Sequence, residues 1–151
     1  MKILASLFSL VVLSVVFNDA FSAGNDDYAV VSNKSVAYYD AVKLLKINEY
    51  DAAIAKLKLA EKLANSDADI QNLLGFASRK SGRLEDAARY YQKALQLDPK
   101  HKGALEYQGE LFLMLGDKSA AEKNLQELNK VCWLGCNELD DLQTAIRNYK
   151  P

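Results

Sequence analysis

The stretch GRLEDAARYYQKALQLDP, residues 82–99, decides the fold of this chain. Its residues Ala87, Tyr91 and Ala94 step by four and then three, which is the spacing of one buried face of a helix. Gly82, which opens the stretch, suits the left-handed turn that ends a preceding helix. The stretch therefore predicts a turn followed by an amphipathic helix, the second half of a helical hairpin.

The same residue types recur 34 residues before and after this stretch. Turn-forming residues recur at one position of this 34-residue period. Small residues recur at two other positions, one in each helix of a hairpin. The turn set is Asn48, Gly82 and Gly116, the first-helix set is Ala41, Gly75 and Gly109, and the second-helix set is Ala53, Ala87 and Ala121. Small side chains at these places let the two helices of a hairpin approach closely. A period of this length predicts stacked helix-turn-helix units with a continuous core.

Residues 82–99 resemble the second half of a tetratricopeptide repeat, and the resemblance extends from residue 34 to about residue 131. It implies an all-α fold, a right-handed α-solenoid of three units at residues 34–67, 68–101 and 102–136. Residues 137–149 then predict a capping helix, because terminal units of solenoids must cover their exposed side. Its apolar residues step by three, four and three: Leu139, Leu142, Ile146 and Tyr149.

Several helix starts carry polar residues that suit helix caps. We expect Asn33 to cap a helix from Ser35 to Ile47, and Ser66 to cap a helix from Ala68 to Lys80. Asn137 is expected to cap the last helix. The acids that follow suit the positive end of the helix dipole and are Glu138, Asp140 and Asp141.

The N-terminus has the pattern of a secretory signal. Lys2 precedes an almost wholly apolar run over residues 3–17, followed by small and polar residues. We expect cleavage after Ser22, which makes residues 1–22 a signal peptide and residues 23–33 a flexible leader. The protein would then be periplasmic or secreted. The alternative is an uncleaved segment that anchors the chain to the membrane, although the apolar run is short for a span.

The charge of the chain is nearly balanced, with a net charge of −1. Such a chain exerts little long-range attraction on phosphate groups, so nucleic acid is not an expected partner. No glycine-rich phosphate loop, Gly-x-Ser-x-Gly turn or His-Glu-x-x-His motif occurs, and the single histidine, His101, has no metal-ligand pattern around it. We therefore expect no enzyme activity, no metal site and no cofactor.

The two cysteines, Cys132 and Cys136, enclose Trp133, Leu134 and Gly135. In an exported protein such a pair favours a disulfide, which would fix the angle of the last helix. In this reading Gly135 turns the chain back, and Trp133 and Leu134 pack on the core. Two alternatives remain open: reduced buried thiols, or a dithiol that carries Cu(I) or electrons.

The resemblance also implies where a partner would bind, since the first helix of each tetratricopeptide unit lines a groove. The residues expected there are Tyr38, Val42, Leu45, Asn72, Phe76, Arg79, Glu106, Glu110 and Leu113. Some family members grip a terminal carboxylate with Lys, Arg and Asn side chains. The matching positions in this chain lack those donors and are Tyr38, Val42, Leu73, Gly103 and Tyr107.

Two functions from different classes follow. The first is a non-catalytic adaptor of the cell envelope that binds a partner peptide or helix in its groove. The second is a small periplasmic thiol carrier that uses the cysteine pair. A third possibility is a subunit of a larger assembly.

Overall fold

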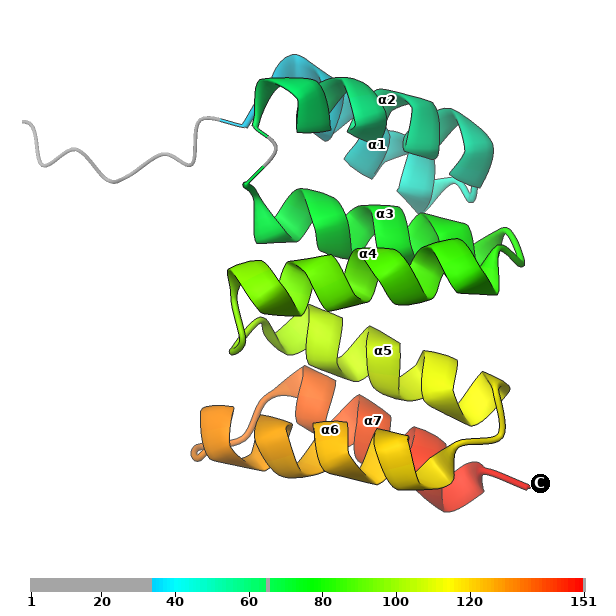
Figure 1. Ribbon diagram of the computed structural model, residues 1–151, viewed down its shortest axis with the longest axis vertical. Coiled ribbons are helices and arrows are strands. Elements are labelled where there is room, and N and C mark those ends of the chain that lie inside the picture. The colour runs from blue at the N-terminus through cyan, green and yellow to red at the C-terminus, as the bar shows by residue number, and fades with distance from the viewer. Residues whose placement is uncertain (1–33, 65, 151) are drawn as a thin grey trace, which may run out of the picture. The chain divides into compact units, whose positions relative to one another are not determined.

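The computed structural model describes residues 34–64 and 66–150. Those residues form seven α-helices, shown in Figure 1, and no strand occurs among them. The helices are α1 (Val36–Lys46), α2 (Tyr50–Leu63), α3 (Ala68–Lys80), α4 (Leu84–Leu97), α5 (Lys102–Met114), α6 (Lys118–Val131) and α7 (Asn137–Asn148). None of the helices in this described part is long and apolar enough to cross a membrane. The predicted signal and leader lie outside the described residues.

The helices pack as successive hairpins. The most extensive contacts join α1 to α2, α3 to α4 and α5 to α6, and neighbouring hairpins meet through α2 with α3 and α4 with α5 (Figure 1). The final helix, α7, packs against both α5 and α6. The prediction of an all-α solenoid of helix-turn-helix units is therefore confirmed.

The three turns within the hairpins have the same geometry. Asn48, Gly82 and Gly116 have positive φ values of 62°, 78° and 82°. In each turn the next residue donates its backbone N–H to the carbonyl five residues earlier, which satisfies a group at the helix end. These bonds join Glu49 to Leu44 (3.0 Å), Arg83 to Ser78 (2.8 Å) and Asp117 to Phe112 (2.8 Å).

The small residues of the repeat lie in the core, and Ala41, Ala53, Ala87 and Ala121 are fully buried. Gly75 faces the ring of Tyr91 from the paired helix α4, as expected. Gly109 differs, because the side chain closest to it is Leu142 of α7. The capping helix therefore occupies the space that Gly109 leaves open, and it is part of the core.

Two predicted caps are wrong, and a third lies outside the described residues. The cap of α3 is Asp67, whose carboxylate accepts from the backbone N–H of Asp69 (3.0 Å) and of Ile70 (3.3 Å). Asn137 is the first residue of α7, and Cys136 precedes it as a cap without a side-chain hydrogen bond. The cap of α1 is Ser35, whereas the expected Asn33 is not described. In the first case the carboxylate of the residue directly before the helix reaches the free N–H groups of its first turn.

Candidate functional site

An apolar hollow lies between the first helices of the three units. It has a volume of about 270 Å³ and takes Val42, Leu45 and Phe76 from the predicted groove set. The ring of Phe76 is central, with its centroid 5.1 Å from that of Tyr107 and 6.4 Å from that of Tyr50. The full lining is Val42, Leu45, Lys46, Leu73, Phe76 and Tyr107. We call this space the apolar hollow.

Arg79 links the hollow to the acidic side of α5. Its guanidinium lies 5.8 Å from the ring centroid of Phe76 and 5.7 Å from that of Tyr107. Its Nη2 is 2.5 Å from Oε2 of Glu110, and its Nε donates to the hydroxyl of Tyr91 at 3.4 Å. The side chain of Arg79 is 9% exposed and that of Glu110 is 30% exposed, so the ion pair is partly shielded from water.

Glu106 is the most unusual acid on this side of the molecule. It is 6% exposed and makes no hydrogen bond or ion pair with the described residues. Burial, and then the nearby charges of Glu110, Asp141 and Glu138, raise the pKa of Glu106 to about 8. Arg79 acts in the opposite direction. The carboxyl of Glu106 is therefore mostly protonated at neutral pH.

The other predicted groove residues have mixed environments. The ring of Tyr38 lies edge-on to that of Tyr39 and under the ammonium of Lys34, with Nζ 5.2 Å from its centroid. Asn72 is buried, and its Oδ1 has no hydrogen-bond partner among the described residues. Leu113 packs in the core with Leu142 and adds little to the groove surface.

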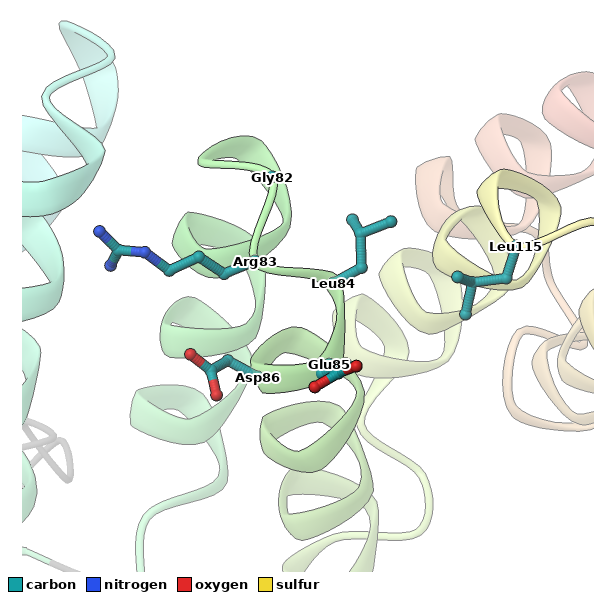
Figure 2. A pocket seen from close by; sticks show the side chains of 6 residues that line it. All are labelled: Gly82, Arg83, Leu84, Glu85, Asp86 and Leu115. Carbon is teal, nitrogen blue, oxygen red and sulfur yellow. The ribbon is translucent and has the colours of Figure 1, made fainter.

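A second hollow, of about 530 Å³, lies beside the turn between α3 and α4 (Figure 2). Leu84 and Leu115 border it, while Arg83 extends away toward α2 and donates to Asp51 at 2.8 Å. Its carboxylates, Glu85 and Asp86, belong to the first turn of α4, where they suit the helix dipole. The charged side chains around this second hollow are therefore explained by their structural roles.

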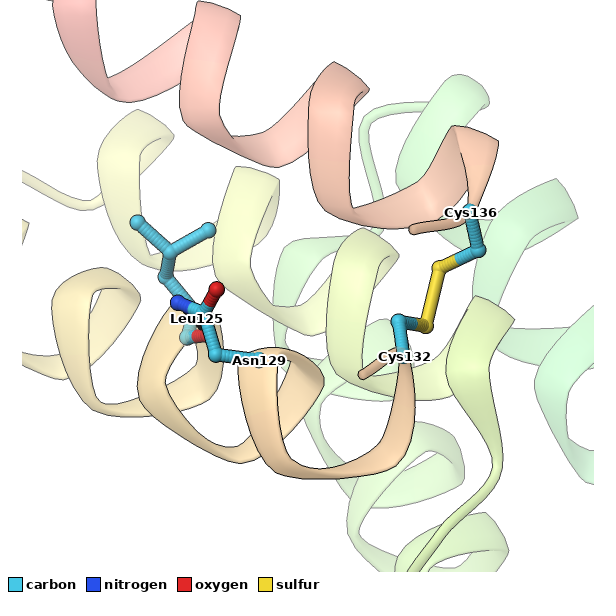
Figure 3. Close-up of a disulfide and its surroundings, with 4 residues drawn as sticks. All are labelled: Leu125, Asn129, Cys132 and Cys136. Carbon is cyan, nitrogen blue, oxygen red and sulfur yellow. Dashed lines mark hydrogen bonds between the residues drawn. A yellow bond between two sulfur atoms is a disulfide. The ribbon is translucent and has the colours of Figure 1, made fainter. Parts of the chain in front are cut away.

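The cysteine pair closes a loop between α6 and α7 (Figure 3). The sulfurs of Cys132 and Cys136 lie at disulfide distance, 2.13 Å apart, and Gly135 has a φ of 88°. Trp133 and Leu134 are 79% and 80% exposed, so the expectation that they pack on the core is wrong. Cys132 itself packs in the core with Leu142 and Ile146 of α7. Within the described part of the chain no three His, Cys, Asp or Glu side chains could hold a metal ion.

His101 has a structural environment. Its Nδ1 accepts from the backbone N–H of Ala104 at 3.1 Å and caps α5, while its Nε2 lies 3.0 Å from Oδ1 of Asp69. Burial alone would raise the pKa of Asp69, but the hydrogen bonds from Lys34 and His101 lower it. These contacts tie the starts of the three first helices together.

Three kinds of residue were missed by the sequence reasoning. Leu73 and Tyr107, named above only as positions without carboxylate-binding donors, line the hollow one position after the predicted groove row, because a helix face is wider than one row. Lys46 lies at the end of α1. The sequence predicts Glu138 and Asp141 only as acids that suit the helix dipole. Their nearness to Glu106 follows if α7 is aligned with the first helices of the three units, as the first helix of a fourth unit.

This stack of helical hairpins has the fold of tetratricopeptide repeat domains. The family described as "Tetratricopeptide repeat" matches residues 68–101, so the middle unit is such a repeat. A "TPR repeat-containing protein" of Treponema pallidum (strain Nichols) is 32% identical over 120 residues. That match covers 70% of this chain but only 14% of the relative, so this chain spans a small part of that protein's length.

Two solved structures illustrate the likeness. MamA from Desulfovibrio magneticus RS-1 is 27% identical with a TM-score of 0.60, covering 63% of this chain and 54% of that chain. The first TPR of Spaghetti (RPAP3), solved bound to the HSP90 peptide SRMEEVD, is 15% identical with a TM-score of 0.66. That match covers 74% of this chain and 89% of the other. At this identity the second likeness concerns the fold.

Proposed function

We propose that this protein is a non-enzymatic interaction module that binds a segment of a partner protein on the face formed by α1, α3 and α5. The observation that carries the proposal is the apolar hollow around Phe76, because an open hollow lined mainly by aliphatic and aromatic side chains suits an apolar anchor. A placement in the cell envelope is part of the proposal and depends on the N-terminal pattern of Lys2 and residues 3–17.

The comparisons support a protein or peptide as the ligand. The RPAP3 domain has the same fold and was solved with a bound peptide. Folds alone do not determine function, so the argument for this chain depends on its own hollow. A segment of a partner would enter it as an extended strip or a short helix.

A terminal carboxylate is not the expected ligand. The positions that hold it in some family members carry apolar side chains, phenols or no side chain in this chain: Tyr38, Val42, Leu73, Gly103 and Tyr107. Val42, Leu73 and Tyr107 line the apolar hollow. Partner recognition would therefore use internal side chains of the bound segment.

The test is a selection of binders from a phage-displayed library of random dodecapeptides on the purified mature protein. We expect enriched peptides with one or two large apolar residues, and we expect Phe76→Ala to lose them. Trp133→Ala is the matched control, because it removes a more exposed aromatic ring away from the hollow. Enriched peptides that bind Phe76→Ala as well as the wild type would contradict the proposal.

A further inference from the structure

The acidic side of the groove has an excess of acceptors over donors. Glu106 faces Glu110 on its own helix and Glu138 and Asp141 on α7, while Arg79 on α3 acts on its pKa in the opposite direction. Arg79 is already engaged by Glu110. We call Glu106, Glu110, Glu138 and Asp141 the carboxylate cluster.

The buried carboxyl of Glu106 is a second, independent sign of a missing partner. Buried polar groups in proteins are normally hydrogen-bonded whether they are charged or neutral, and an unsatisfied one is costly. Glu106 is more than nine-tenths buried but has no hydrogen bond in the described structure. The fully enclosed side-chain atoms without a partner in this part of the chain are Gln71 Oε1 and Asn72 Oδ1, so the carboxyl of Glu106 is not fully enclosed.

Asn72 lies beside the same helix, one turn before Glu106. A Cβ atom at Gly103 would be 3.0 Å from the Asn72 Nδ2, and Gly103 and Glu106 lie on the same side of α5 because they are three residues apart. The side-chain oxygen of Asn72 also accepts no hydrogen bond from residues 34–64 and 66–150. The ligand that suits this region is therefore one that brings N–H donors and positive charge.

A metal ion does not fit that description. Among residues 34–64 and 66–150 no group of three carboxylates, histidines or cysteines is close enough to hold one. A guanidinium or ammonium group can bind without three ligands close together, because its N–H donors point in several directions. Arg79 illustrates this within the groove, where its guanidinium lies near two aromatic rings and pairs with Glu110.

We propose that the carboxylate cluster binds a Lys or Arg side chain of the same partner segment whose apolar residue fills the hollow. The two subsites are joined by Arg79, whose guanidinium lies 5.7 Å from the ring centroid of Tyr107 in the hollow and pairs with Glu110 of the carboxylate cluster. Charge complementarity selects this occupant over an acidic or a purely apolar segment. The proposal deepens the proposed function and rests on it.

Binding of the basic side chain is coupled to a proton. The ion pair needs the carboxylate form of Glu106, whereas at pH 6 the free protein holds the protonated form, because its pKa is raised to about 8. The cation must displace that proton below pH 8, so the affinity rises as the pH increases toward 8 and then levels off. The other groups that face Glu106 are Glu110, Glu138, Asp141 and Arg79.

The experiment extends the dodecapeptide selection to Glu106→Gln. We expect wild-type binders to combine an apolar residue with Lys or Arg, and Glu106→Gln binders to keep the apolar residue while Lys and Arg return to library frequency. Glu127→Gln is the control, since it makes the same substitution at an exposed position on α6 outside the carboxylate cluster. An enriched peptide with its basic residue acetylated or replaced by citrulline should bind the wild type about tenfold more weakly.

The pH dependence supplies a further readout. Affinity for an enriched peptide should rise severalfold between pH 6 and pH 8.5 in the wild type and stay flat in Glu106→Gln. Asp141→Asn, an exposed position that leaves the core intact, should weaken the same peptide by a smaller factor and covers the case in which Glu106→Gln fails to fold.

Three outcomes would overturn the inference. Binders that depend on Phe76 but carry no basic residue, or that bind Glu106→Gln unchanged, would overturn it and leave the proposed function standing. Absence of any binder that depends on Phe76 would overturn both. Selection of acidic peptides would overturn the charge argument directly.

Discussion

The ring of Tyr91 occupies the space that a side chain at Gly75 would need. A Cβ atom at Gly75 would lie 2.5 Å from Cε1 of Tyr91, far inside van der Waals contact. Tyr91 is fully buried, so its ring has little room to move away. The second unit therefore depends on a glycine in the middle of a helix, although alanine is the better helix former.

Gly75→Ala should lower the free energy of unfolding by about 1–3 kcal/mol through overpacking, and Gly75→Leu should unfold the unit. Urea denaturation followed by circular dichroism measures both. The clash explanation requires that Tyr91→Leu partly compensates for Gly75→Ala, so the two substitutions should be non-additive in a double-mutant cycle. Additive effects would show that the loss of stability in Gly75→Ala has another cause.

Phe76→Ala should leave the fold nearly intact, because Phe76 is only partly buried and lines an open hollow. We expect an unfolding free energy within about 1 kcal/mol of the wild type and a cooperative melting transition. Binding of a selected peptide should weaken by about 1–3 kcal/mol, as for an aromatic anchor. A collapsed fold with unchanged peptide binding would identify Phe76 as a core residue.

Glu106 should make stability depend on pH. In the unfolded chain its pKa is near 4.5, whereas in the folded protein it is about 8, so the folded state binds more protons between these values. The contribution of Glu106 to the free energy of unfolding is fully present below pH 4.5 and is lost as the pH rises toward 8. Between pH 6 and 9 we expect a loss of about 2–3 kcal/mol from this source. Urea titrations of wild type and Glu106→Gln should differ in slope against pH, and equal slopes would contradict the prediction.

Cys132 and Cys136 should be joined in the native protein. Replacement of either by serine should cost about 1–3 kcal/mol, because the disulfide would close only a short loop. Mass spectrometry after thiol blocking of freshly isolated folded protein measures the pairing. Two blocked thiols would contradict the disulfide, and a Cu(I) titration of that reduced protein would then test the carrier alternative.

The mature chain should begin after Ser22. The motive is the order of Lys2, the apolar run over residues 3–17 and the small residues that follow. The intact mass of protein isolated from its native cell decides the question. A mass that includes Met1 would contradict processing and favour the anchored alternative.

The turns were predictable because each depends on one local property. Asn48, Gly82 and Gly116 tolerate positive φ, and their spacing alone indicates where the first helices end. The buried alanines followed from the same period.

The environment of Glu106 was not predictable in the same way. It depends on how α7 docks against α5, which is a contact between distant parts of the sequence. The exposure of Trp133 was not predictable for a related reason, because Leu142 and Ile146 of α7 pack in the core with Cys132. Periodicity indicates which face of a helix is apolar, but it does not indicate which of several apolar residues will reach the core first.

The exposed loop between the two cysteines also gives the protein an intrinsic optical probe. Trp133 is the only tryptophan in the chain, and it lies in water directly beside Cys132. Disulfides quench the fluorescence of a neighbouring indole, so opening of the pair would brighten the emission without any added label. Because the hollow around Phe76 contains no indole, this signal would follow the sulfurs separately from peptide binding.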